Sequence, residues 1–139
     1  MAGPTVSLSL DWGEGMTFRN ADDSPDIHLA SSTPGVTSPP QALAYAVMAC
    51  MAMDVVHVVQ KGRHRLDAMH IRFHGQRAEV HPRRFVSMRL HFDLTGEMPD
   101  HVVTRAIDLS REKYCSVWNT IKDDVQLETS FSVRLTGGR

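Results

Sequence analysis

The sequence predicts an α+β fold in which helices cover one face of a mainly antiparallel β-sheet. Segments of alternating apolar residues, typical of strands, lie near the start, in the middle and at the end of the 139-residue chain. A long apolar segment over residues 38–62 and a second stretch over residues 99–123 have the spacing of helices. The length suits one domain with a substantial core, so we expect a single domain over residues 1–139.

The first part of the chain, residues 1–37, is expected to hold short strands and a loop. Val6–Leu10 alternates as a strand does, Gly13–Gly15 supplies a turn, and Met16–Phe18 returns as the hairpin partner. Ile27–Ala30 is a further short strand, and the Ser, Thr, Gly and Pro residues after it are typical of a loop.

The long helix is expected over residues 38–62. Ser38 offers a hydroxyl N-cap, Pro39 suits the first helical position, and Gly62 suits the C-terminal stop. The helix is apolar on nearly every side, which predicts that other elements bury it on several sides. Three residues interrupt its apolar run, which favours a buried helix over a membrane span. These residues are Cys50, Asp54 and His57.

The rest of the chain is predicted to form a hairpin, two helices and a final strand. The hairpin covers residues 66–96, because Ala68–His74 and Phe85–Thr95 both alternate between apolar and polar residues. Helices are expected over residues 99–123, and the strand over residues 124–136 follows them. The polar face of the hairpin should be solvated or lie against a partner subunit. It holds His70, Arg72, His74, Arg89, His91 and Asp93.

Charge and composition exclude several classes of protein. The formal net charge is −1, so no basic excess favours a nucleic-acid partner. Met1–Val6 lacks the basic and apolar regions of a targeting segment, so the expected location is the cytoplasm, without membrane attachment. Residues 1–60 hold six acidic residues and a single base, Arg19, which makes Arg19 the one Arg or Lys before Lys61.

The chain has two cysteines, Cys50 and Cys115, which lie 65 residues apart. In a cytosolic protein they are seldom a permanent disulfide, so two unrelated buried thiols and a redox pair both stay open at this point. Cys50 lies in the middle of an apolar helix, where burial makes a thiol inert unless a cation is delivered to it. Cys115 is expected at a helix start, where unpaired N–H groups favour a thiolate, so local physics favours Cys115 as the more acidic thiol.

Two segments around these cysteines are similar to a known family. Residues Thr37–Val56 resemble the first-cysteine helix of the OsmC/Ohr family (osmotically inducible protein C and organic hydroperoxide resistance), and Arg105–Val117 resembles its second-cysteine segment. The runs Glu112–Val117 and Val59–Arg63 look closest to the OsmC-like branch. The resemblance covers nearly the whole chain.

The resemblance implies a fold, an assembly and an activity. The fold has mainly antiparallel sheets wrapped around long central helices in an intertwined homodimer, with active sites at the subunit interface. Cys50 would attack an organic hydroperoxide and become a sulfenic acid, Cys115 would form a disulfide with it, and an external dithiol would reduce that disulfide. Arg19 is the candidate for the arginine that stabilises the thiolate. No metal or organic cofactor is implied.

One position departs from the family pattern. The family has a glutamate early in the first-cysteine helix that steadies the arginine, whereas this chain has Pro40 and Gln41. Gln41 can hydrogen-bond a guanidinium but cannot neutralise it. Asp54 would oppose thiolate formation, so we expect it to be structural. The residues expected to line a substrate pocket are Gln41, Tyr45, Met51, Tyr114 and Trp118.

Two other functions stay open at the level of sequence. The missing glutamate suggests a non-catalytic protein on the same dimeric scaffold, which binds a small hydrophobic ligand or senses redox state. A weaker alternative is a zinc site on the polar sheet face, formed by His70, His74 and His91.

Overall fold

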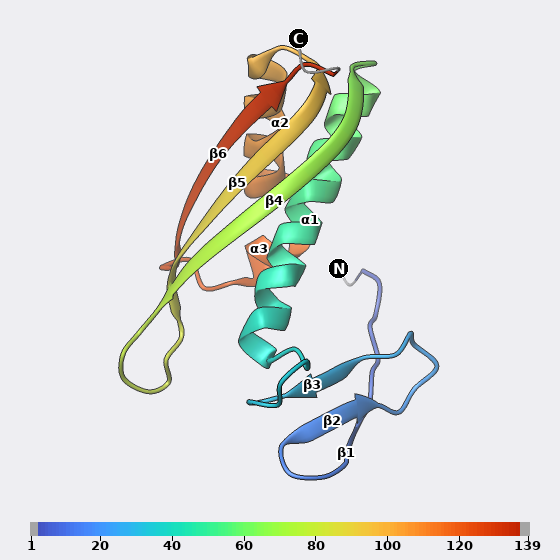
Figure 1. The fold of residues 1–139 in the computed structure, drawn as a ribbon, viewed down its shortest axis with the longest axis vertical. Helices are drawn as coiled ribbons and strands as arrows, with labels where there is room; N and C mark the ends of the chain where they lie inside the picture. The colour runs from blue at the N-terminus through green and yellow to red at the C-terminus, as the bar shows by residue number, and fades with distance from the viewer. Residues whose placement is uncertain (1–2, 137–139) are drawn as a thin grey trace. The chain divides into compact units, whose positions relative to one another are not determined.

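The computed structural model describes residues 3–136, so both ends of the expected domain, residues 1–2 and 137–139, lie outside the described residues. The chain forms two compact units, one ending at Leu43 and one starting at Ala44. Each unit is described by itself below, and Figure 1 shows the order of their elements.

The first unit contains a three-stranded antiparallel sheet of order β1-β2-β3. The predicted hairpin is present, and Gly15 lies in its turn with a φ of 60°, which a glycine adopts without strain. The first strand begins at Leu10 rather than Val6, because the Ser9 N–H donates to the Asp22 carboxylate (2.7 Å) instead of to a neighbouring strand. The strand bounds are β1 Leu10–Trp12, β2 Thr17–Asn20 and β3 His28–Ala30.

The long helix α1 spans Pro39–Lys61, as the sequence predicts. Its start is a capping box: the Gln41 N–H donates to Ser38 Oγ (3.4 Å), and the Ser38 N–H donates to Gln41 Oε1 (3.0 Å). At the other end the Gly62 N–H donates to the Val58 carbonyl (3.1 Å). The cap explains why the helix begins directly after Ser38.

The second unit contains a three-stranded sheet of order β4-β5-β6. The hairpin strands β4 and β5 are antiparallel, as expected, whereas β6 pairs with β5 in parallel. Two neighbouring strands can be parallel only if a long crossover connects them, and the helices between β5 and β6 form this crossover. The bounds are β4 Arg65–Arg77, β5 Phe85–Glu97, α2 Asp100–Leu109, the π-helical turn η1 Ser110–Tyr114, α3 Ser116–Thr120 and β6 Gln126–Arg134.

The core of this unit lies between the helices and one face of the sheet, and Figure 1 shows α1 and α2 on the same side of the strands. The α1 residues Val47, Met51, Val55 and Val59 are fully buried, as is Phe92 on the central strand. Among the described residues, α1 is the one helix long and apolar enough to cross a membrane. Its buried stripe identifies it as the core helix of this fold.

The sequence predicts that other elements bury α1 on several sides, and within the second unit the helix has one buried stripe and one exposed face. Tyr45 and Met53 are 63% and 69% exposed, and Ala46 and Ala49 between them are also exposed. The reason is that the sheet and α2 lie on one side of the helix only. An apolar face of α1 is therefore left uncovered by the other elements of the second unit.

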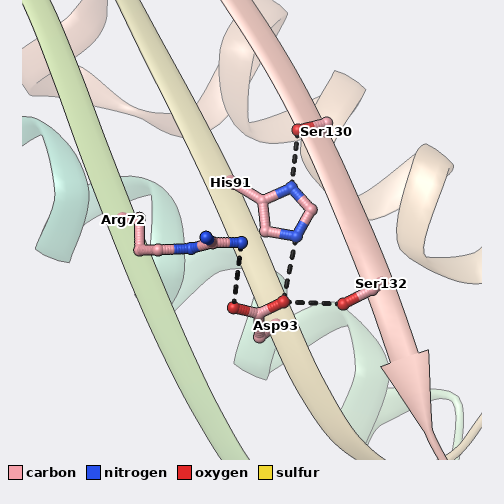
Figure 2. A network of polar contacts seen from close by, with 5 residues as sticks. All are labelled: Arg72, His91, Asp93, Ser130 and Ser132. Carbon is pink, nitrogen blue, oxygen red and sulfur yellow. Dashed lines mark hydrogen bonds and ion pairs between the residues drawn. The ribbon is translucent and has the colours of Figure 1, made fainter.

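The outer face of the sheet carries a polar network, shown in Figure 2. His91 Nδ1 lies 2.7 Å from Ser130 Oγ, and His91 Nε2 lies 2.9 Å from Asp93 Oδ1. The same Asp93 oxygen accepts from Ser132 (2.7 Å), and Arg72 forms an ion pair with the other oxygen (3.4 Å). Each serine lies opposite its partner in the β5–β6 register, so the network joins these two strands.

This network predicts a loss of stability in acid. The Ser132 hydroxyl, followed by His91 and Arg72, lowers the pKa of Asp93 from its usual 3.8. A carboxyl whose pKa is lower in the folded state stabilises the fold above 3.8, and that stabilisation is lost as the pH falls through the lowered value. Urea unfolding between pH 5 and about pH 2 should therefore depend less on pH in Asp93→Asn than in the wild type.

The matched control is Asp123→Asn, because the Asp123 carboxyl has no hydrogen bond or ion pair with residues 3–136. It should keep the pH dependence of the wild type. An unchanged slope in Asp93→Asn would show that the outer network makes no contribution to acid sensitivity.

Candidate thiol site

The site is built around Cys50 and Cys115, both of which are free thiols in the second unit. Cys50 lies near the middle of α1 and is half-buried. Cys115 lies in the break between η1 and α3 and is 0% exposed. π-Helical turns are frequent at functional sites, because the extra residue redirects the chain that follows.

Hydrogen bonds fix the backbone of Cys115 on both sides. Its N–H donates to the Ser110 carbonyl (2.8 Å), and its own carbonyl accepts from the Asn119 N–H (3.0 Å) and from Asn119 Nδ2 (2.8 Å). The Trp118 N–H donates to Cys115 Sγ (3.2 Å), so the sulfur is the N-cap of α3. The thiol is therefore held in one position.

The prediction that Cys115 is the more acidic thiol is not supported. The predicted helix start is present, and the Trp118 N–H does lower the pKa. Burial is the larger effect, and together with the neighbouring Cys50 thiol and the Asp54 carboxylate it raises the pKa of Cys115 to about 11. The single N–H donor at the start of the five-residue helix α3 lowers the pKa of Cys115 by less than the loss of solvent raises it.

The same interactions place Cys50 beside Cys115. The Cys50 thiol raises the pKa of Cys115 both as a hydrogen-bonding neighbour and through its charge. Residues remote in the sequence are thus adjacent in the fold, with the α1 thiol partly open to solvent and the second thiol closed off behind it. This arrangement can form a disulfide once the first sulfur is oxidised.

Asp54 lies one turn after Cys50 on α1 and is tied to η1. Its carboxylate accepts a hydrogen bond from Ser110 Oγ (2.7 Å), and Ser110 is 0% exposed. Because the Ser110 carbonyl also accepts from Cys115, this serine links the helix of one cysteine to the backbone of the other. The expected structural role of Asp54 agrees with this contact, and its partner is a side chain of the same chain.

The predicted pocket residues of the second unit fall in different places. Tyr114 lines a cavity that also includes Asp54, and Trp118 is half-buried beside Cys115. Met51 is fully buried in the core cluster that also contains Cys115, whereas Tyr45 is 63% exposed. At about 100° per residue, they point roughly 100° and 140° away from Cys50 around the helix. The assignment of Met51 and Tyr45 to a substrate pocket stays a prediction.

The remaining two predicted residues belong to the first unit. Gln41 uses Oε1 to accept from both the N–H and the hydroxyl of Ser38 (3.0 and 3.2 Å), so its carbonyl oxygen is committed to the helix cap. Arg19 is exposed on β2, opposite Asp11 and His28 in the strand register. Its action on the Cys50 thiolate stays a prediction.

Sequence reasoning missed Ser110, which lies beside the thiols, and two basic residues in the cavity that Asp54 lines. Ser110 could have been suspected, because a buried Asp54 requires a hydrogen-bond donor. Lys61 and Arg105 line the same cavity as Asp54 and Tyr114. Their positions in the sequence do not indicate that they lie close together in the fold.

The zinc alternative on the sheet face finds no support. Within residues 3–136, no cluster of three His, Cys, Asp or Glu residues could hold a metal ion. Both ring nitrogens of His91 are engaged, one with Ser130 and one with Asp93.

Known proteins resemble this chain in sequence and in fold. The family model described as OsmC-like protein matches residues 32–130. Protein YhfA of Escherichia coli K12 is 37% identical over 131 residues, which are 92% of this chain and 98% of that protein.

Two solved structures illustrate the shared fold. A hypothetical protein from Aquifex aeolicus VF5 has a TM-score of 0.88 at 24% identity, covering 96% of this chain and 98% of that one. The organic hydroperoxide resistance protein OsmC from Legionella pneumophila has a TM-score of 0.70 at 21% identity, covering 96% of this chain and 100% of that one. With the family match over residues 32–130 and the agreement in fold, the chain belongs to the OsmC-like protein family.

Proposed function

We propose that this protein is a thiol-dependent peroxidase that reduces organic hydroperoxides with Cys50 and Cys115. The observation that supports it is the pairing of a half-buried thiol with a fully buried one at the break between η1 and α3. Membership of a family that includes organic hydroperoxide resistance proteins agrees with this activity.

The reaction needs only the two thiols and an external dithiol. The Cys50 thiolate attacks the terminal peroxide oxygen, the O–O bond breaks, and the alkoxide takes up a proton and leaves as an alcohol. Cys115 sulfur then attacks the sulfur of the Cys50 sulfenic acid, so that an S–S bond forms and water leaves. Two thiol–disulfide exchanges with the dithiol regenerate both thiols and leave the dithiol as a disulfide.

The two cysteines have different roles because their surroundings differ. Burial raises the pKa of Cys115, so its thiol stays protonated near neutral pH. Cys115 is also closed to solvent, whereas Cys50 is partly open. Cys50 is therefore the attacking thiol, and Cys115 stays neutral until a sulfenic acid forms beside it and its proton can leave with the water.

Cys50 requires a cation, because Asp54 lies one turn away and opposes a second negative charge. We assign this role to Arg19, as the resemblance of the sequence implies. Gln41 Oε1 is held in the helix cap and cannot neutralise the guanidinium, so the arginine would lack the carboxylate that steadies it in the family.

The test is the consumption of cumene hydroperoxide with a dithiol reductant. Cys50→Ser should abolish turnover, and Arg19→Ala should lower kcat/KM by at least tenfold, whereas Ser116→Ala, at an exposed serine beside Cys115, should keep full activity. Equal rates in wild type and Cys50→Ser would overturn the assigned role. A wild-type protein that binds apolar ligands and consumes no peroxide would favour the non-catalytic alternative.

We also propose that the protein is a homodimer through the exposed face of α1. Tyr45, Ala46, Ala49 and Met53 form an apolar stripe on a helix that is otherwise part of the core. Such a contiguous patch marks an interaction surface, and a two-fold axis would pack the stripe against its own copy.

The dimer can be tested by sedimentation of Met53→Lys. A charge in the centre of the stripe should raise the dimer dissociation constant at least tenfold, because about 1.4 kcal/mol corresponds to a factor of ten. Glu79→Lys, in the exposed β4–β5 connection, is the control and should leave the assembly unchanged. A monomeric wild type at micromolar concentration would contradict this proposal.

A further inference from the structure

The outer face of the β4-β5-β6 sheet holds a serine, a histidine and an aspartate in direct polar contact (Figure 2). Ser130 Oγ lies 2.7 Å from His91 Nδ1, and His91 Nε2 lies 2.9 Å from Asp93 Oδ1. The imidazole therefore lies between a hydroxyl and a carboxylate. This is the order of groups that activates the serine of many acyl-transfer enzymes, on folds that are otherwise unrelated.

The surroundings of Asp93 decide which ring nitrogen of His91 carries the proton. The carboxylate accepts from Ser132 Oγ (2.7 Å) and forms an ion pair with Arg72 (3.4 Å), and both contacts favour its ionised form. Because an ionised carboxylate only accepts hydrogen bonds, Nε2 of the neutral imidazole donates to it and Nδ1 keeps a lone pair. The Ser130 hydroxyl then donates to Nδ1, so the imidazole can take its proton as a general base.

The three groups are held by the sheet and are open to small molecules. Ser130 is exposed, whereas the His91 side chain is 26% exposed. The two residues lie opposite each other in the β5–β6 register, so strand pairing fixes their separation. A base that is held in contact with its nucleophile reacts without first having to find it, and the open serine leaves room for a substrate.

A cation lies beside the serine on the same face. Arg89 is two residues before His91 on β5, and its Nε lies 4.0 Å from Glu128 Oε2. Glu128 is two residues before Ser130 on β6, so both side chains point to the outer face. The guanidinium therefore lies over the β5–β6 pair next to the serine, where its N–H groups can stabilise the oxyanion of an attacked carbonyl.

We propose that Ser130 is the nucleophile of a second site, which hydrolyses small activated esters with His91 as its base. Asp93 is a positioning residue, because it holds the imidazole in the required tautomer. The exposed face offers little surface to bind a substrate, which favours esters with a small acyl group and a good leaving group, such as aryl acetates. This activity is separate from the proposed peroxidase and uses neither cysteine.

The reaction has two steps. Ser130 Oγ bonds to the carbonyl carbon, its proton passes to His91 Nδ1, and the C–O bond to the leaving group breaks, so that the alcohol leaves with this proton. Water then attacks the acyl-serine, His91 takes a proton from the water and returns it to Ser130, and a carboxylic acid is released.

The nucleophile is tested by covalent labelling of the full chain that carries Cys50→Ser and Cys115→Ser, so that no thiol competes. Diisopropyl fluorophosphate should add one phosphoryl group per chain, and peptide mapping should find it on Ser130. His91→Ala should slow this labelling about a hundredfold, because a general base contributes a factor of about 10²–10⁴ in rate. Asp93→Asn should also slow it, since an amide that donates to Nε2 leaves Nδ1 as a donor.

Ester turnover is measured in the same background with p-nitrophenyl acetate. Ser130→Ala removes one exposed hydroxyl and should lower kcat/KM about a hundredfold with an unchanged circular dichroism spectrum. Ser87→Ala, four residues before His91 on the same face of β5, is the matched control and should keep the rate.

Three outcomes would overturn the proposal. They are label spread over several serines or absent from Ser130, equal labelling rates with and without His91, and ester turnover that is unchanged in Ser130→Ala. Because the background lacks both cysteines, a failed peroxidase assay leaves this test unaffected.

Discussion

Replacing Cys115 with serine is expected to stop the reaction after about one turnover. Cys50 would still attack the hydroperoxide, because its access and its activating cation are unchanged. The resulting sulfenic acid would then lack the sulfur that lies beside it, since a serine hydroxyl cannot form a disulfide. Further peroxide would carry Cys50 to the sulfinic and sulfonic acids, which a dithiol does not reduce.

The measurement is a progress curve combined with intact mass. With excess hydroperoxide, Cys115→Ser should consume about one equivalent per active site rapidly, and then gain two or three oxygen atoms on Cys50. The rate with a dithiol should fall by roughly a thousandfold, the range expected when an essential step is removed. Sustained turnover at the wild-type rate would show that Cys115 has no part in the cycle.

Replacing Ser110 with alanine is expected to give the largest loss of stability among the residues around the thiols. The change removes the donor to Asp54 and leaves a partly buried carboxylate without its partner, which costs about 1–3 kcal/mol. Because Ser110 also holds the Cys115 N–H through its carbonyl, the loss of its contact with α1 should let η1 move away from Cys50. Disulfide formation should therefore slow as well.

Urea unfolding of the reduced protein measures the loss of stability, and stopped-flow oxidation measures the rate of disulfide formation. The double variant Ser110→Ala, Asp54→Asn should be less destabilised than the sum of the two single variants, since removing both partners leaves no charge unpaired. Ser116→Ala serves as the control for a serine-to-alanine change on the exposed side of Cys115. A Ser110→Ala loss below about 0.5 kcal/mol would mean that this contact does not brace the site.

Much of the fold follows from local patterns in the sequence. The bounds of α1 were predictable because Ser38, Pro39 and Gly62 act through local hydrogen bonds and backbone geometry. The strands β4 and β5 were predictable because alternation reports which side chains face the core. The parallel pairing of β6 was not, because alternation is the same in parallel and antiparallel strands, and the crossover alone decides the direction.

The site was harder to predict from the sequence, because its properties depend on packing between residues far apart in the chain. The two cysteines were identified by resemblance, but their relative acidity depends on burial, which the spacing around Cys115 does not report. Met51 was assigned to a pocket because its type suits one, and its full burial in the core was not readable from the helix pattern alone. Lys61 and Arg105 meet at one cavity only through the packing of α1 on α2.

The most direct test is to treat the reduced protein with one equivalent of organic hydroperoxide, block free thiols, and map the cysteines by peptide mass spectrometry. The account predicts a loss of two hydrogen atoms from the intact chain and one cross-linked pair of peptides joining Cys50 to Cys115 within a single chain. Two free thiols after the peroxide is added, or an added oxygen on Cys50 with Cys115 still alkylated, would contradict it.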